Sequence, residues 1–159
     1  MITRDFLKSV EIFAALSDED LGALAAIGAE EVYKKGQPIF REREPAEKLF
    51  VVVSGVVEVV KSAPGDARIH RLARLERGEI LGEISAFDRG PRSATAVAAV
   101  VPETRLLAFA LAEFQAYLAK RPQAAIPIQA ALLRKMGQRL RQASEGIHTL
   151  LRALEGSPV

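Results

Sequence analysis

The spacing of apolar residues divides the chain into three regions, of which the first is helical. Residues 3–28 carry apolar side chains at helical intervals. Four of them can share one helical face: Phe6, Val10, Phe13 and Leu16. Ser17 stands three residues before Asp20, the spacing of an N-terminal capping box, and Asp18 and Glu19 lie where a helix dipole favours acidic groups. The region therefore predicts helices, one of which begins just after Ser17.

Between residues 29 and 110 the pattern changes to short runs rich in β-branched residues, which favour strands. The clearest runs are 49–53, 56–60, 67–75, 97–101 and 104–109. Tight turns are expected at Ser54-Gly55, Pro64-Gly65-Asp66 and Pro102-Glu103. The runs 49–53 and 56–60 are then two strands joined by a tight turn, and so are the runs 97–101 and 104–109. Many short strands separated by turn residues predict an antiparallel barrel or jelly roll.

The chain returns to helical spacing after residue 110. A short helix is expected over 111–120, ended near Pro122, and a longer helix follows to about Leu154. Apolar residues recur at every seventh position of the long helix, as in a coiled coil: Ile126, Leu133, Leu140, Ile147 and Leu154. The other position of this seam holds small or apolar residues: Ala130, Gly137, Ser144 and Leu151.

A second stripe on the long helix can pack against the barrel: Leu132, Met136, Ala143 and Leu150. The coiled-coil seam is then left for a partner, so we expect a homodimer joined through this helix. The alternative is a helix that packs only on its own barrel.

Composition excludes several classes of site. The chain has no cysteine, and its two histidines, His70 and His148, lie far apart in the sequence. A disulfide scaffold, a thiolate metal site and a cysteine nucleophile are therefore excluded, and a histidine-rich metal site is not expected. No nucleophile–base pair, metal-ligand set or Walker loop is recognised. The sequence indicates a protein that is not an enzyme and needs no cofactor.

Charge and hydropathy are those of a soluble globular protein. Charged residues make up 26% of the chain and the formal net charge is only +2, which gives a weak argument for nucleic acid as a partner. The N-terminus does not resemble a signal peptide, and no apolar run is long enough to cross a membrane. We therefore expect a cytoplasmic protein with no membrane partner.

Residues 78–95 combine side chains that together suit a nucleotide. Gly82 removes a side chain where a ligand can approach the backbone, and 83–87 can form a helical turn whose first N–H groups have no internal partner. Arg92 can place its guanidinium on an anion held there, and Ser93 can add a hydroxyl donor. Glu83 would repel a phosphate, so its carboxylate is expected to accept a hydrogen bond from a neutral group such as a sugar hydroxyl.

These residues resemble the phosphate-binding cassette of cyclic nucleotide-binding domains, which occur in the bacterial cAMP receptor protein and in regulatory subunits of cAMP-dependent protein kinase. The similar residues are Gly82-Glu83-Ile84-Ser85 and, after a short loop, Pro91-Arg92-Ser93-Ala94-Thr95. Segments 35–40 and 49–55 and the flanking helices are also similar, so the resemblance covers nearly the whole chain. It implies a mainly β fold: an eight-stranded antiparallel jelly-roll β-barrel with N-terminal helices and a long C-terminal helix.

On this basis we assign residues 1–122 to the cyclic nucleotide-binding barrel with its helices, and 123–159 to a C-terminal lid and dimerisation helix with a tail. The resemblance implies that Glu83 binds the ribose 2′-hydroxyl, that Arg92 pairs with the cyclic phosphate and that Ser93 adds a phosphate contact. Backbone amides near three further residues would complete the cradle: Gly82, Ile84 and Ser85.

By the same resemblance, the long helix covers the base, and Ser144 beside Ala143 falls at the place that contacts adenine. Family members that bind cGMP often carry threonine after the arginine, so Ser93 favours cAMP as the ligand over cGMP. We expect a sensor that closes its C-terminal helix on the nucleotide and signals to a downstream protein, whose identity the sequence leaves open.

Three alternatives remain. Glu83 and Arg92 could form a salt bridge that only holds a loop. The chain could be the sensor part of a transcription regulator; direct DNA binding is not expected, because few residues follow the long helix where bacterial members carry a helix-turn-helix. The barrel could also be an interaction module that binds no nucleotide.

At the position of Arg43, many members of the family have a glycine in a turn. Because Glu44 is present here, we expect the turn to persist in altered form.

Overall fold

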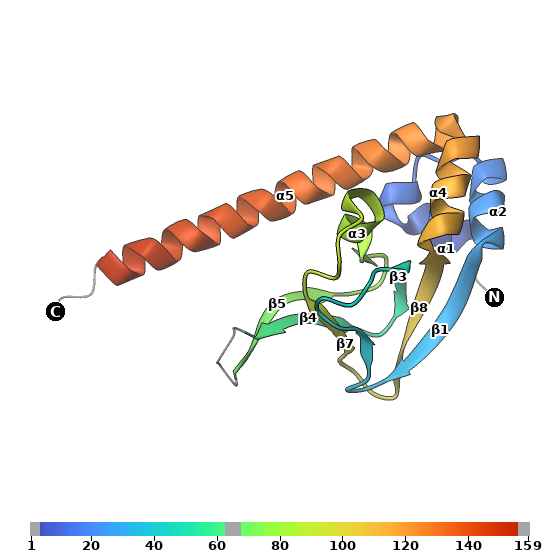
Figure 1. The fold of residues 1–159 in the computed structure, drawn as a ribbon. Coiled ribbons are helices and arrows are strands. Elements are labelled where there is room, and N and C mark those ends of the chain that lie inside the picture. The colour runs from blue at the N-terminus through green and yellow to red at the C-terminus, as the bar shows by residue number, and fades with distance from the viewer. Residues whose placement is uncertain (1–3, 63–67, 156–159) are drawn as a thin grey trace.

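The computed structural model describes residues 4–62 and 68–155, and its described part contains two antiparallel sheets flanked by helices (Figure 1). The helices are α1 (Arg4–Ser9), the 3-10 helix η1 (Glu11–Phe13), α2 (Asp18–Ala26), α3 (Glu83–Asp88), α4 (Leu111–Lys120) and α5 (Pro122–Glu155). The strands are β1 (Gly28–Lys34), β2 (Pro38–Phe40), β3 (Lys48–Ser54), β4 (Val57–Ser62), β5 (Ile69–Leu75), β6 (Ile80–Leu81), β7 (Thr95–Ala98) and β8 (Glu103–Ala110).

The strand order confirms the predicted jelly roll. One sheet has the order β1-β8-β3-β6 and the other β2-β7-β4-β5, and every recorded pair is antiparallel. Side chains between the sheets form one apolar cluster, built around Phe50, Val52 and Leu106. The expected arrangement of eight strands, N-terminal helices and a long C-terminal helix is therefore what the described residues adopt.

Two of the predicted turns do not close hairpins. β3 pairs with β8 and β6, whereas β4 pairs with β7 and β5, so Ser54-Gly55 carries the chain from one sheet to the other. Likewise, β7 ends at Ala98 rather than at 101, and it does not pair with β8. The reason is burial: β3 has four consecutive buried residues, so both of its faces need cover. The second sheet covers one face and helices cover the other, which a lone hairpin would not provide. The turn expected at Pro64-Gly65-Asp66 lies outside the described residues.

The N-terminal helices are present and the predicted cap of α2 is confirmed, but the segment before Ser17 is not one continuous helix. Ser17 is the N-cap of α2, and its side-chain oxygen accepts a hydrogen bond from the Asp20 backbone N–H at 3.1 Å. The four residues expected on one helical face are all buried: Phe6, Val10, Phe13 and Leu16. They do not share a helix, because α1 ends at Ser9 and η1 at Phe13. They pack with α4 and the outer face of the first sheet, where the rings of Phe13 and Phe109 meet edge to face at 6.2 Å.

Asp20 links these helices to the junction of α4 and α5. Its buried carboxylate accepts hydrogen bonds from the Ser17 hydroxyl at 2.7 Å and from Arg121 Nη1 at 2.8 Å, and the Tyr117 hydroxyl donates to its backbone carbonyl. The hydrogen bonds from Ser17 and then Arg121 lower the pKa of Asp20. Burial raises the pKa of the Tyr117 hydroxyl to about 12. The base of α5 is thereby fixed to the body of the protein.

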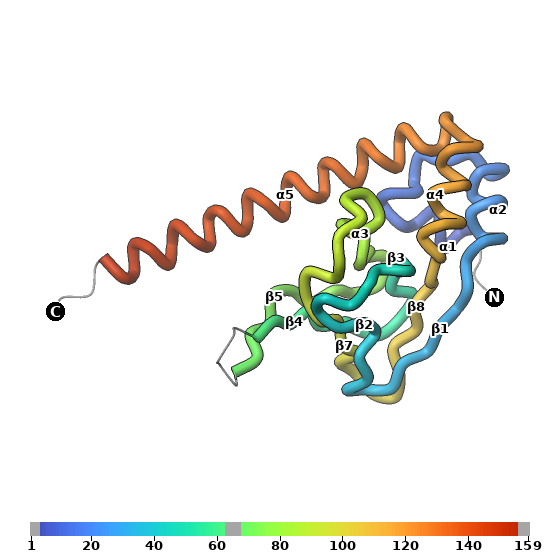
Figure 2. Tube along the Cα trace, viewed as in Figure 1, coloured from blue at the N-terminus to red at the C-terminus, as the bar shows by residue number. Residues whose placement is uncertain are grey.

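Only the first part of α5 packs on the barrel side of the molecule. Its buried residues end at Leu132, and every residue from Arg141 to Glu155 is exposed. The predicted second stripe is therefore right for Leu132 and the partly buried Met136 but wrong for Ala143 and Leu150, because the helix runs straight on and leaves the curved sheets behind (Figure 2). No helix in the described ranges is both long and apolar enough to span a membrane.

Candidate functional site

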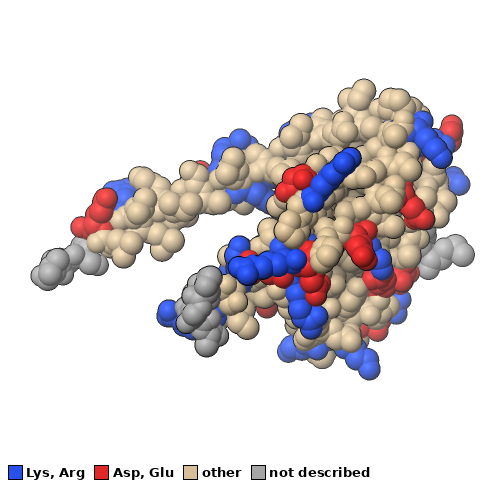
Figure 3. Space-filling view, in the orientation of Figure 1, with Lys and Arg blue, Asp and Glu red and all other residues tan. Residues whose placement is uncertain are grey.

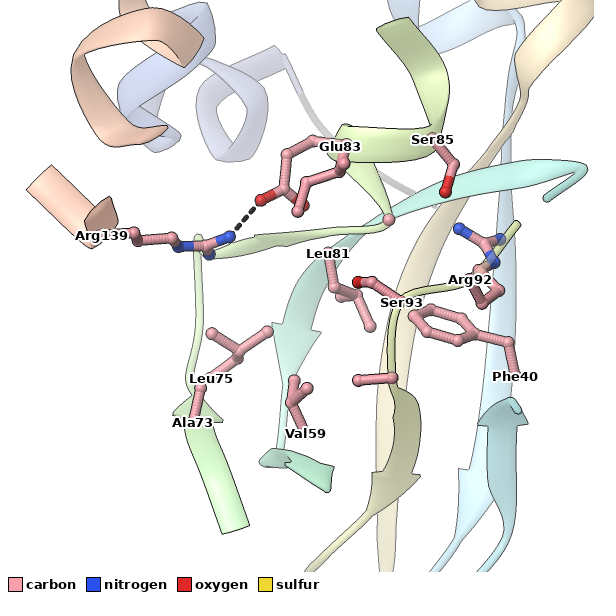
Figure 4. Close-up of a pocket in the computed structure, with 13 residues that line it drawn as sticks. Phe40, Val59, Ala73, Leu75, Leu81, Glu83, Ser85, Arg92, Ser93 and Arg139 are labelled. Atoms are coloured by element: carbon pink, nitrogen blue, oxygen red, sulfur yellow. Dashed lines mark hydrogen bonds and ion pairs between the residues drawn. The ribbon is translucent and has the colours of Figure 1, made fainter. Parts of the chain in front are cut away.

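A cavity of about 140 Å³ lies where α3, α5 and strands of both sheets meet (Figure 4). Its floor and sides are apolar, with Phe40, Val59 and Leu81 among the lining residues. Six of the seven residues expected at the ligand site line it: Gly82, Glu83, Ile84, Ser85, Arg92 and Ser93. The fold therefore brings the two halves of the cassette, which precede and follow α3, into one hollow.

Gly82 is required at the entry to α3 for two reasons. It is the N-cap of that helix with φ of 81°, a left-handed conformation that residues with a Cβ rarely adopt. In addition, a methyl group on its Cα would overlap Nη1 of Arg92 and lie 3.2 Å from the carbonyl oxygen of Lys48. The glycine thus lets the arginine pass directly beneath the start of the helix.

Arg92 is buried, with only 4% of its surface exposed. Its Nη2 donates a hydrogen bond of 2.5 Å to the carbonyl oxygen of Lys48, and its Cζ lies 4.0 Å from the centre of the Phe40 ring. Nε and Nη1 are also buried and have no hydrogen-bond partner among the described residues. Burial lowers the pKa of the guanidinium, an effect that the nearby charges of Glu44 and Glu83 oppose.

Glu83 is buried as well, with 3% of its surface exposed, and its partner is Arg139 of α5. Figure 4 shows the Arg139 side chain reaching from the helix to the Glu83 carboxylate. Arg139 Nη2 also lies 3.3 Å from the carbonyl oxygen of Ile80. The Glu83–Arg92 salt bridge considered from the sequence is therefore not formed, and the arginine that does bind Glu83 was not among the expected site residues.

The remaining expected residues differ in how far they face the cavity. The hydroxyl of Ser85, which is buried, lies 3.5 Å from the carbonyl oxygen of Pro91 across the cassette loop. Ile84 and Ser93 are exposed at the rim. Ser144 does not line the cavity: it is exposed on α5, more than one helical turn beyond the arginine that contacts Glu83.

A turn at 41–44 supports the cassette from outside. Arg43 adopts the left-handed conformation, with φ of 69°, so the turn expected there is present without glycine. The Arg43 N–H donates to the Arg92 carbonyl at 2.8 Å, and the Arg92 N–H donates to the Glu44 carbonyl at 2.9 Å. These two bonds fix the backbone that carries the buried guanidinium.

Comparison with known proteins agrees with this geometry. A family model described as "Cyclic nucleotide-binding domain" matches residues 30–121, more than half of the chain. The "CRP-like cAMP-activated global transcriptional regulator" of Mycobacterium tuberculosis is 29% identical over 147 residues, which cover 92% of this chain and 62% of that protein. The "Cyclic AMP receptor protein" of Thermus thermophilus is 34% identical over 130 residues, which cover 82% of this chain and 59% of that protein.

A solved structure is similar over almost its whole length. The N-terminal domain of a transcriptional regulator from Streptomyces coelicolor A3(2) is 36% identical, with a TM-score of 0.72, and the match covers 90% of this chain and 95% of that one. The chain spans about three fifths of the length of the two curated relatives above. The match of the family model, the shared jelly roll and the cassette residues gathered in one cavity lead to one conclusion: this chain belongs to the cyclic nucleotide-binding domain family, related to the cAMP receptor proteins.

Proposed function

We propose that the chain is a regulatory sensor that binds a cyclic nucleotide, with cAMP as the preferred ligand, and that it catalyses no reaction. The observation that carries the proposal is Arg92, a buried cation beside a cavity, two of whose nitrogens have no hydrogen-bond partner in the described part of the chain. Burying a charge without a hydrogen-bonded partner is unfavourable, so a site that keeps one is suited to receive an anion. A cyclic phosphate diester has one negative charge and free oxygens that accept hydrogen bonds from such nitrogens.

Glu83 supports a ligand that combines the phosphate with a sugar. A lone anion would be repelled by this carboxylate, whereas a ribose 2′-hydroxyl would donate a hydrogen bond to it. Because Arg139 forms an ion pair with the Glu83 carboxylate, the sugar hydroxyl would either share this carboxylate with Arg139 or displace Arg139 from it. The cavity of about 140 Å³ is also below the range of roughly 300–1,000 Å³ usual for small-molecule sites, so binding is expected to move α5 or the cassette.

Movement of α5 is the proposed output of the sensor. The coiled-coil seam on this helix is exposed in the single chain: Ile126, Leu133, Leu140, Ile147 and Leu154 are each between 59% and 74% exposed. Figure 3 shows the outer part of α5 standing clear of the body of the molecule. We propose that the seam joins two copies, that closure of α5 brings Ser144 towards the base, and that ligand and dimer geometry are coupled.

Calorimetric titration of the full chain with cAMP and cGMP tests the proposal. Hydrogen bonds to a charged group contribute about 1.5–3 kcal/mol, so Arg92→Ala is expected to weaken cAMP binding by about ten- to a hundredfold. Arg89 offers a matched control, because it lies in the same loop and is exposed. Arg89→Ala should leave the affinity within about twofold.

Thermal denaturation with and without cAMP, together with the titration, separates the sensor from an interaction module built on this fold. Ligand at a hundred times its dissociation constant adds about 2.7 kcal/mol to the free energy of unfolding, which is easily seen as a rise in melting temperature. Heat of binding and a raised melting temperature with cAMP, both reduced in Arg92→Ala, are the expected result. Unchanged affinity in Arg92→Ala would remove this arginine from the site, and no response of the wild-type chain to either nucleotide would refute the proposal.

A further inference from the structure

Arg92 has an unusual environment for a buried cation. Within the described residues it forms no ion pair, although two carboxylates are near enough to affect it through space. Each of these is engaged by another arginine: Glu44 lies 3.7 Å from Arg41, and Glu83 binds Arg139. Since a buried, unpaired charge is unfavourable, some other group must stabilise the guanidinium.

The ring of Phe40 meets this requirement. The Cζ of Arg92 lies 4.0 Å from the ring centre, well within the distance at which the negative face of an aromatic ring attracts a guanidinium. The ring stabilises the charge through its π face and accepts no conventional N–H hydrogen bond. Among the residues that the structure describes, Nη2 alone forms a hydrogen bond, with the Lys48 carbonyl, which leaves Nε and Nη1 for another acceptor.

Phe40 is itself held firmly in this position. It ends β2, where the pairing with β7 shifts register between Pro38 and Phe40. Such an irregularity re-aims a side chain, and it is frequent beside functional sites. The Phe40 ring also stacks on Phe50 with centroids 6.1 Å apart and planes inclined by 27°, and Phe50 is buried between the sheets.

We propose that Phe40 is the positioning residue for Arg92: its ring holds the buried guanidinium in place without supplying an anion, so that the phosphate of the ligand is the first anion the arginine pairs with. Figure 4 shows the ring beside Arg92 at the edge of the cavity. A carboxylate at this position would also hold the arginine, but it would compete with the phosphate. The inference rests on the proposed function, because it assigns Phe40 a role in binding the same ligand.

Four proteins form a double-mutant cycle that tests the proposal, with Phe40→Tyr as a fifth, conservative control: the wild type, Phe40→Leu, Arg92→Gln and the double variant. Leucine keeps an apolar side chain but lacks the ring, so Phe40→Leu is expected to weaken cAMP binding about tenfold, as measured by calorimetry. In the Arg92→Gln background, which lacks the charge, Phe40→Leu should lower the affinity for cAMP by less than about twofold. Phe40→Tyr keeps the ring and should bind within about twofold of the wild type.

The outcomes separate this inference from the proposed function. An equal loss from Phe40→Leu in both backgrounds would mean that the ring acts on the ligand or on folding, and would overturn the positioning role. Failure of the wild type to bind cAMP would instead refute the proposed function. Urea unfolding of the same four proteins then still decides whether the ring stabilises the arginine. Coupling between the two substitutions is expected there too, and strictly additive effects would overturn the contact.

Discussion

Gly82→Ala is the sharpest test of the site geometry, because the chain contains a matched control. Gly82 and Gly78 have nearly the same backbone conformation, with φ of 81° and 83°. A Cβ in this left-handed region costs about 1–2 kcal/mol in either place. At Gly78, however, an added methyl group would meet no described residue within 4 Å, whereas at Gly82 it would overlap Nη1 of Arg92.

The two alanine variants should therefore lose a similar amount of stability but differ in their affinity for cAMP. At about 2–4 °C of melting temperature per kcal/mol for a chain of this size, each should melt roughly 2–8 °C lower by calorimetry. Only Gly82→Ala must also displace the guanidinium, so it alone should lose about ten- to a hundredfold in cAMP affinity. If both variants bind cAMP equally well, the close approach of Arg92 to the start of α3 has no part in binding, and the reasoning is refuted.

Three further predictions follow from other contacts. If Glu83 accepts the ribose 2′-hydroxyl, the wild type should bind 2′-deoxy-cAMP with an affinity at least about tenfold lower than its affinity for cAMP. Glu83→Gln should reduce this ratio of affinities, and an unchanged ratio would contradict the role of Glu83. The hydrogen bond from Ser17 lowers the pKa of Asp20, so the wild type should be more stable than Asp20→Asn near neutral pH. This difference in the free energy of unfolding should shrink as the pH falls below about 4, and melting curves in which the difference does not depend on pH would contradict the prediction. Replacing Leu140 and Ile147 by lysine should convert a dimer to a monomer in sedimentation velocity without lowering the melting temperature of the barrel, whereas a wild-type monomer would exclude the proposed seam.

The sequence was most informative where chemistry and backbone conformation depend on the same few residues. A glycine, a carboxylate and an arginine at the cassette spacing are enough to predict Gly82, Glu83 and Arg92 at one site, and the fold gathers all three around the cavity. The N-cap at Ser17 was predictable for a similar reason, since a cap depends only on neighbouring residues. Local rules of this kind do not require knowledge of which strands pair.

Strand pairing was harder to predict because it depends on distant residues. The runs at 49–53 and 56–60 look the same whether they form a hairpin or cross between two sheets, and only the partners of β3 in β6 and β8 decide the matter. The limit of the second stripe on α5 has the same origin. Ala143 and Leu150 continue the periodicity of Leu132, but periodicity says nothing about where the barrel ends.

Arg139 shows what a closer reading of that stripe could have found. It follows Met136 by three residues and Leu132 by seven, so all three lie on one face of the helix, and the arginine is the last of them to contact the barrel. At that point a basic residue needs an acidic partner, and Glu83 had already been expected in the cavity. Because the same carboxylate is the proposed acceptor for the sugar, a bound nucleotide would alter the contact between Arg139 of α5 and the cassette. The outer part of the helix, which carries the exposed seam, would then respond to an exchange of hydrogen bonds on one buried carboxylate.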